Sequence, residues 1–156
     1  MLAIEYKIHL AVGAPLKSEK LPKIGLISID RNGLVQTYSK MHLHGGEENY
    51  FSPGNKHHLI TLNNTKIANA ICADTNHPIH CLKCVNLGAS AYIAGSMISS
   101  TGYQADTDML QNYAEQYNML VALANYSSKT GKVADGWQPI GKSAIWLKQG
   151  LLVVAE

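Results

Sequence analysis

Cys72 is the first residue of this 156-residue sequence whose type and position favour chemistry. It ends the apolar run 67–72 and precedes a polar turn that leads through Pro78 into a predicted helix. A thiol at such a strand-to-helix corner lies near free backbone N–H groups, which with the helix dipole stabilise a thiolate and can receive an oxyanion. The alternative interpretation is a buried cysteine acting as a small hydrophobic residue, and position alone favours that alternative.

Lys40 is the second candidate. It follows a predicted strand, where a lysine is usually a solvated surface charge. The next segment, Gly45-Gly46-Glu47-Glu48-Asn49-Tyr50-Phe51-Ser52-Pro53-Gly54, mixes acidic, aromatic and turn residues, which is unusual for a plain connection. This context makes Lys40 a candidate for a functional role.

Short apolar runs separated by turn residues predict the elements that position these residues. The predicted strands are 8–14 (buried, ending at Gly13 and Pro15), 24–30, 34–38, 59–62, 65–71, 91–94, 119–125, 143–147 and 151–155. Asn32-Gly33 predicts a hairpin, and Asn63-Asn64 a second one. Helices are predicted at 2–7, after Cys72, and over 106–118. Hairpins combined with strand–helix–strand units predict mixed sheets covered by helices.

Composition narrows the class of protein. Thirteen basic and eleven acidic residues give a net charge of +2, so nucleic acid is not the expected partner. Apolar residues make up 46%, which is typical of a globular chain, and one domain is expected at this length. The apolar runs fall short of the roughly 20 residues that span a bilayer, and no signal peptide is recognised. Three cysteines without an export signal favour a cytoplasmic thiol protein.

Three ordered motifs resemble those of the carbon–nitrogen hydrolase (nitrilase/amidase) superfamily. Tyr38-Ser39-Lys40-Met41-His42-Leu43 is similar to the family's lysine motif, and Glu47 through Gly54 resembles the stretch that follows it. Ile71-Cys72-Ala73-Asp74, with Pro78 six residues after the cysteine, resembles the nucleophile motif. Asn125 and Gly141-Lys142-Ser143 also follow in a family-like order.

The resemblance implies an α/β (α+β) fold, a partial four-layer α-β-β-α sandwich of the nitrilase type, over a single domain at 1–156. It implies hydrolysis of an amide or nitrile through a thioester on Cys72, with Lys40 and the backbone N–H of Ala73 as oxyanion donors and Glu47 as a supporting glutamate. It implies no metal or organic cofactor, a small-molecule substrate and a homodimer. These roles require the sulfur of Cys72 and the amine of Lys40 to face a shared cavity.

One part of the family's pattern has no counterpart here. Its general base is a glutamate upstream of the lysine motif, whereas Glu5 and Glu19 are the only acidic residues before Asp30. Glu5 is expected on a helix tail and Glu19 in a charged loop, so neither is assigned that role. We therefore expect the chain to lack the family's usual N-terminal part. A pseudoenzyme or assembly subunit is the alternative function.

A second alternative is a small zinc-binding module. His77, His80, Cys81 and Cys84 lie within eight residues, and Cys81-x-x-Cys84 has a metal-like spacing. On a helix, His77, Cys81 and Cys84 are expected to share one face and His80 to point partly away. Packing and surface roles account for all four, so zinc is the less favoured interpretation.

Two further features have competing interpretations. Tyr103, Met109, Tyr113 and Tyr117 form a stripe on the predicted helix, which favours a helix face packed on a sheet. The family resemblance adds a role in subunit contacts. The stretch 127–141 is predicted to be a long loop, either a lid or a surface loop, in which Trp137 lines a substrate entrance or anchors the loop.

Overall fold

A computed structural model describes residues 1–127 and 138–156, so Trp137 and most of the predicted loop 127–141 lie outside the described residues. The chain forms two compact units, Met1–His58 and Leu59–Glu156. The first unit contains α1 (Leu2–Glu5), β1 (Leu10–Leu16), β2 (Lys23–Ile29), β3 (Val35–Ser39) and the 3-10 helix η1 (Glu47–Asn49). The second contains β4 (Leu59–Leu62), β5 (Thr65–Ile71), the 3-10 helix η2 (Cys72–Asn76), α2 (Pro78–Asn86), β6 (Ala91–Ser96), α3 (Tyr103–Tyr117), β7 (Leu120–Asn125), β8 (Ala144–Leu147) and β9 (Gly150–Val154).

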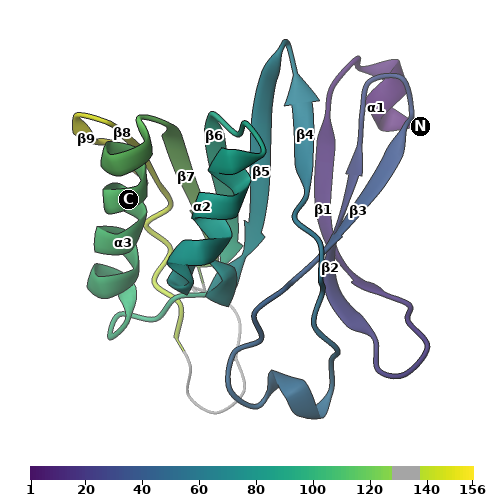
Figure 1. The fold of residues 1–156 in the computed structure, drawn as a ribbon, viewed down its shortest axis with the longest axis horizontal. Coiled ribbons are helices and arrows are strands. Elements are labelled where there is room, and N and C mark those ends of the chain that lie inside the picture. The colour runs from purple at the N-terminus through teal and green to yellow at the C-terminus, as the bar shows by residue number, and fades with distance from the viewer. Residues whose placement is uncertain (128–137) are drawn as a thin grey trace. The chain divides into compact units, whose positions relative to one another are not determined.

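The sheet of the first unit is an antiparallel meander in the order β1-β2-β3 (Figure 1). The prediction for 8–14 was wrong in two respects, because most side chains of β1 are exposed and the strand continues through Gly13 and Pro15 to Leu16. Proline is tolerated there because β1 is an edge strand, where a missing N–H need not interrupt a ladder on both sides. An apolar run was therefore misread as a buried strand.

Both predicted hairpin turns are confirmed. Asn32-Gly33 lies between β2 and β3, where Gly33 has φ +88° and the Asp30 carboxylate accepts the N–H of Asn32. Asn63 and Asn64 join β4 to β5 with φ angles of +47° and +65°. Positive φ at both central residues is what a tight two-residue hairpin needs, and asparagine adopts it more readily than most residues.

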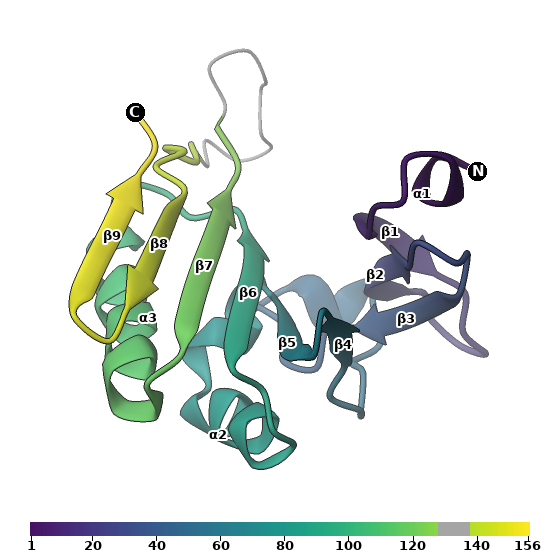
Figure 2. The ribbon, with the colours of Figure 1, turned by 90° about the horizontal axis from the view of Figure 1, so that it is seen from above.

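The sheet of the second unit has the order β4-β5-β6-β7-β8-β9. Its strands β5, β6 and β7 are parallel, and the remaining pairs are antiparallel. Parallel neighbours need a crossover connection, which α2 supplies between β5 and β6 and α3 between β6 and β7. Both helices lie on the same face of the sheet (Figure 2). A mixed sheet covered by helices is thus confirmed for the second unit, whereas the sheet of the first unit is wholly antiparallel.

The core of the second unit lies between this sheet and its two helices. Leu110, Tyr113 and Tyr92 are buried in it, and Tyr103, Met109 and Tyr117 pack against it while partly exposed. The aromatic stripe of α3 therefore packs against the unit's own core, as the helix-face interpretation predicted.

The helices of the described residues are short. The longest, α3, has 15 residues and ends where Asn118 adopts a left-handed conformation with φ +49°. Across 1–127 and 138–156, none of the helices combines the length and the apolar character needed to cross a membrane.

Replacing Leu110 by Ala is expected to lower the free energy of unfolding by about 2–5 kcal/mol, because its side chain is fully buried and a cavity remains. Leu152→Ala is the matched control. Leu152 is 60% exposed, so its truncation is expected to change stability by less than about 0.5 kcal/mol. Urea denaturation measures both, and equal losses in the two variants would contradict this account of the core.

Candidate active site

Cys72 lies at the corner where β5 ends and η2 begins, as the sequence predicted. Its backbone has φ +48°, in the left-handed region that residues with a Cβ rarely adopt and that costs about 1–3 kcal/mol. Cys72 is partly exposed as a residue, whereas Cys81 and Cys84 are buried. Cys72 is therefore not the buried cysteine of the alternative interpretation.

Three side chains hold this corner. The fully buried Asp74 accepts the N–H of Ile71 at 3.0 Å, and the Thr75 hydroxyl donates to the carbonyl of Cys72 at 2.8 Å. From α3, the Tyr113 hydroxyl donates to the carbonyl of Thr75 at 2.8 Å. The residues on both sides of Cys72 are thus fixed by hydrogen bonds to groups that the core excludes from water.

Ala73 is the second residue of η2. Backbone N–H groups in the first turn of a helix have no partner within the helix, so the N–H of Ala73 is a donor next to the thiol-bearing residue. This is the geometry that the sequence analysis anticipated, and the oxyanion role of Ala73 stays a prediction.

Lys40 and Glu47 are brought together within the first unit. The Nζ atom of Lys40 lies 2.8 Å from Oε1 and 2.6 Å from Oε2 of Glu47, and the N–H of His44 donates to Oε2 at 2.8 Å. Lys40 is only 1% exposed, against 28% for the side chain of Glu47. Lys40 is therefore no solvated surface lysine, because its ammonium is buried and fixed by a carboxylate.

The segment from Glu47 to Gly54 is fastened to the sheet of the first unit. The N–H of Gly54 donates to the carbonyl of Lys40 at 2.7 Å, and the N–H of Lys40 donates to that of Ile24 in β2 at 2.8 Å. A Cβ at position 54 would overlap the carbonyl oxygen of Ser39. Only glycine allows the backbone to approach so closely, which accounts for the residue type that ends this motif.

The histidine and cysteine cluster on α2 does not share one environment. His80, Cys81 and Cys84 are buried, whereas His77 is exposed. The prediction that His80 points away from the common face was wrong, because the residue that does so is His77. The pKa of Cys81 is raised to about 12 by burial and by the neighbouring Cys84. The pKa of Cys84 is raised to about 12 by burial and by the neighbouring Asp74. Both residues belong to the hydrophobic core of the second unit.

Asn125, at the end of β7, ties two segments together with its buried amide. Its Oδ1 accepts the N–H of Ile98 at 2.7 Å, and its Nδ2 donates to the carbonyls of Ile98 at 3.1 Å and Gly141 at 2.7 Å. The family-like order of Asn125 and the Gly141 segment is thus matched by a contact between them.

Thr75 and Tyr113 are the contributors that the sequence analysis missed. A threonine three residues after Cys72 carries a local signal, since such hydroxyls often bond the carbonyl three residues earlier. Tyr113 carries none, because it lies 38 residues from the carbonyl that it contacts. Only the packing of α3 against the corner reveals its role.

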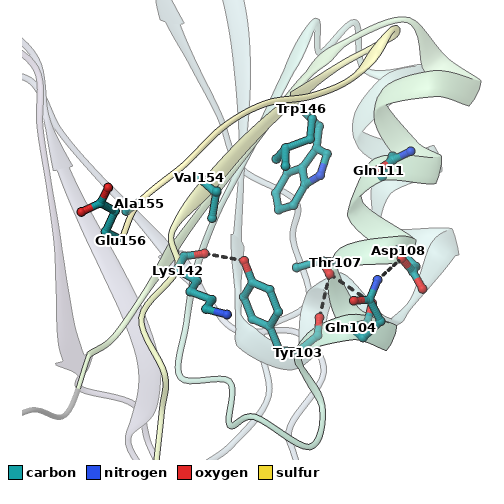
Figure 3. Close-up of a pocket in the computed structure, with 11 residues that line it drawn as sticks. Tyr103, Gln104, Thr107, Asp108, Gln111, Lys142, Trp146, Val154, Ala155 and Glu156 are labelled. Carbon is teal, nitrogen blue, oxygen red and sulfur yellow. Dashed lines mark hydrogen bonds between the residues drawn. The ribbon is translucent and has the colours of Figure 1, made fainter.

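A groove of about 470 Å³ lies elsewhere in the second unit, between α3 and the end of the sheet (Figure 3). Tyr103 and Lys142 border it, joined by a 2.6 Å hydrogen bond from the tyrosine hydroxyl to the lysine carbonyl. Lys40, Glu47 and Cys72 are not among its lining residues. Within the second unit, Cys72 therefore does not line the groove.

The sequence matches the carbon-nitrogen hydrolase family over residues 1–155, and the chain belongs to that family. A search of curated proteins finds no significant match.

Solved structures of the nitrilase superfamily have the same fold. Nit3 from Saccharomyces cerevisiae is 23% identical, with a TM-score of 0.86 over 99% of this chain and 58% of that protein. A carbon-nitrogen hydrolase from Helicobacter pylori G27 is 19% identical, with a TM-score of 0.85 over 99% of this chain and 60% of that one.

A third neighbour is a mutant amidase from Nesterenkonia sp. AN1, described with the acetamide moiety of fluoroacetamide covalently added at its active site cysteine. It is 20% identical, with a TM-score of 0.82 over 99% of this chain and 59% of that one. At such identities the likeness shows the fold, and the chain spans about three fifths of these proteins.

Replacing Gly54 by Ala is expected to cost about 1–3 kcal/mol of stability, because the new Cβ meets the backbone of Ser39, which cannot rotate away. Gly45→Ala is the control, since a Cβ there meets nothing within 4 Å. Chemical denaturation of both variants tests the difference. A Gly54→Ala protein as stable as Gly45→Ala would refute the close approach.

Native protein treated with iodoacetamide at about pH 8 is expected to take up one label, at Cys72. Cys81 and Cys84 are fully buried with pKa values of about 12, so they are expected to react only after denaturation. Peptide mapping by mass spectrometry locates the label, and Cys72→Ala serves as the unlabelled control. Equal labelling of all three cysteines in the native protein would contradict this arrangement.

Proposed function

We propose that the protein hydrolyses a non-peptide C–N bond, most simply that of an amide, through a thioester on Cys72. The observation that carries the proposal is a partly exposed cysteine at a strained strand-to-helix corner, in a chain that belongs to the carbon-nitrogen hydrolase family. Strained backbone in a residue with a Cβ clusters at functional sites, because the surrounding structure must maintain it.

The reaction has two steps. The Cys72 thiolate attacks the amide carbon, the C–N bond breaks, and the amine leaves with a proton, which gives the acyl thioester. Water then attacks the thioester carbon, the C–S bond breaks, and the acid is released with the thiol regenerated. The scheme uses neither a metal nor an organic cofactor.

The proposed oxyanion donors are Lys40 and the backbone N–H of Ala73. A fixed ammonium stabilises negative charge that develops only in the transition state. The two oxygens of Glu47 hold the Lys40 ammonium in place, which supports this role for Lys40 and a supporting role for Glu47. The proposal requires the Cys72 sulfur and the Lys40 amine to face a shared cavity.

The proposed substrate class is inferred from structural neighbours of the chain. The adduct of the Nesterenkonia amidase joins an acetamide moiety to a cysteine, and this supports a small amide, with a nitrile as the other member of the class. The proposal includes a homodimer, which sedimentation measurements can test.

Cys72→Ala is expected to abolish amide turnover, because no other thiol replaces the nucleophile. Lys40→Met is expected to lower kcat by about 10²–10³-fold, the usual loss for one oxyanion donor. Ammonia release from a panel of small amides and nitriles measures both. Wild-type rates in Cys72→Ala would overturn the nucleophile assignment.

Mass spectrometry after incubation with the same panel separates an enzyme from an assembly subunit. An acyl adduct on Cys72 supports hydrolysis, and its absence across the whole panel favours the non-enzymatic role. The Cys72→Ala protein is the control for non-specific acylation.

A further inference from the structure

We propose that Thr75 and Tyr113 are positioning residues that hold the backbone of Cys72 in its strained conformation and thereby set the reactivity of its thiol. The inference rests on the proposed function in one respect, the role of Cys72 as the nucleophile. All the contacts that carry it lie within the second unit.

The strained backbone needs a restraint. The left-handed φ of +48° at Cys72 is costly for a residue with a Cβ and persists only where neighbouring groups enforce it. The hydroxyl of Thr75, itself 2% exposed, provides such a restraint by donating to the Cys72 carbonyl at 2.8 Å. Its other acceptor is Oδ1 of Asn76 at 3.0 Å, on an exposed side chain. The carbonyl of Cys72 is the nearer of the two acceptors.

Thr75 is fixed in turn by Tyr113. The Tyr113 hydroxyl donates to the Thr75 carbonyl at 2.8 Å, and the Tyr113 side chain is buried. Its ring packs edge-on against Tyr92, with ring centroids 6.0 Å apart, and in a tilted arrangement against Tyr117, with centroids 6.4 Å apart. Burial raises the pKa of the Tyr113 phenol well above its ordinary value, so the hydroxyl stays a donor at working pH.

These two bonds form a chain from α3 to the Cys72 carbonyl. Asp74 separately holds the N–H of Ile71, before the cysteine. Removing the Thr75 hydroxyl therefore leaves the corner attached on one side and free to relax at Cys72. A misplacement of about 1 Å at a reacting atom costs on the order of 10² in rate, so the loss is expected in reactivity.

The test uses four variants of the full chain: Thr75→Val, Thr75→Ser, Tyr113→Phe and Tyr117→Phe. Valine keeps the shape of threonine without the hydroxyl, serine keeps the hydroxyl, and phenylalanine removes one oxygen atom. Tyr117→Phe is the matched control, because Tyr117 lies one turn along the same helix and, in the described part of the chain, its hydroxyl makes no hydrogen bond to residues 72–76.

Two readouts are measured: the rate of iodoacetamide alkylation of Cys72 at fixed pH, and kcat and KM for any amide that the wild type hydrolyses. In Thr75→Val, the alkylation rate and kcat are each expected to fall by about 10–100-fold, with KM nearly unchanged. Tyr113→Phe is expected to lower the alkylation rate and kcat by about 3–10-fold, because Tyr113 acts through Thr75. Thr75→Ser and Tyr117→Phe are expected to retain wild-type rates.

Wild-type alkylation in Thr75→Val and Tyr113→Phe would overturn the inference. Labelling of Cys81 and Cys84 alongside Cys72 would also count against it, because it shows that the whole unit has loosened. If Thr75→Val does not fold, the alkylation rate of Cys72 in Tyr113→Phe tests the inference. Turnover that survives in Cys72→Ala refutes the proposed function alone, since alkylation still tests the positioning.

Discussion

The turn of the backbone at Cys72 is the constraint on which the candidate site depends. The chain leaves β5 at Ile71 and enters η2 at Cys72, and Cys72 adopts a positive φ at this junction. This backbone conformation is unfavourable by itself, so interactions with neighbouring groups must offset its free-energy cost. Asp74, Thr75 and Tyr113 do so through hydrogen bonds, of which the one from Tyr113 is buried and the other two are partly buried.

A different physical problem is solved around Lys40. A buried ammonium is costly unless it is paired and hydrogen-bonded, and removing the partner of a buried ion pair typically costs about 3–5 kcal/mol. Glu47 provides that pairing from only seven residues away, and the backbone bond from Gly54 to Lys40 closes the loop between them. Such an arrangement adds little to stability but fixes the position of a positive charge.

Local patterns predicted most elements of the fold. Asn32-Gly33 and Asn63-Asn64 marked their hairpins correctly because turn geometry depends on the conformational freedom of the turn residues themselves. The wrong predictions concern residues whose exposure to solvent depends on tertiary packing. The strand at β1 is exposed although its sequence is apolar, and His80 is buried although it is polar, because a hydrogen bond with the Tyr92 hydroxyl at 2.9 Å satisfies its ring.

The sequence by itself determined the thiol at a strand-to-helix corner, the spacing of Lys40 and Glu47, and the glycine that ends their loop. Each of these depends on residues that are close along the chain, where backbone geometry limits the outcome. Only the tertiary structure decided which groups restrain the corner and which cysteines are buried. Tyr113 reaches Thr75 across 38 residues through the docking of α3, and nothing in the local pattern encodes such a contact. Long-range packing depends on the shapes of all the elements together, so it emerges only when the chain has folded.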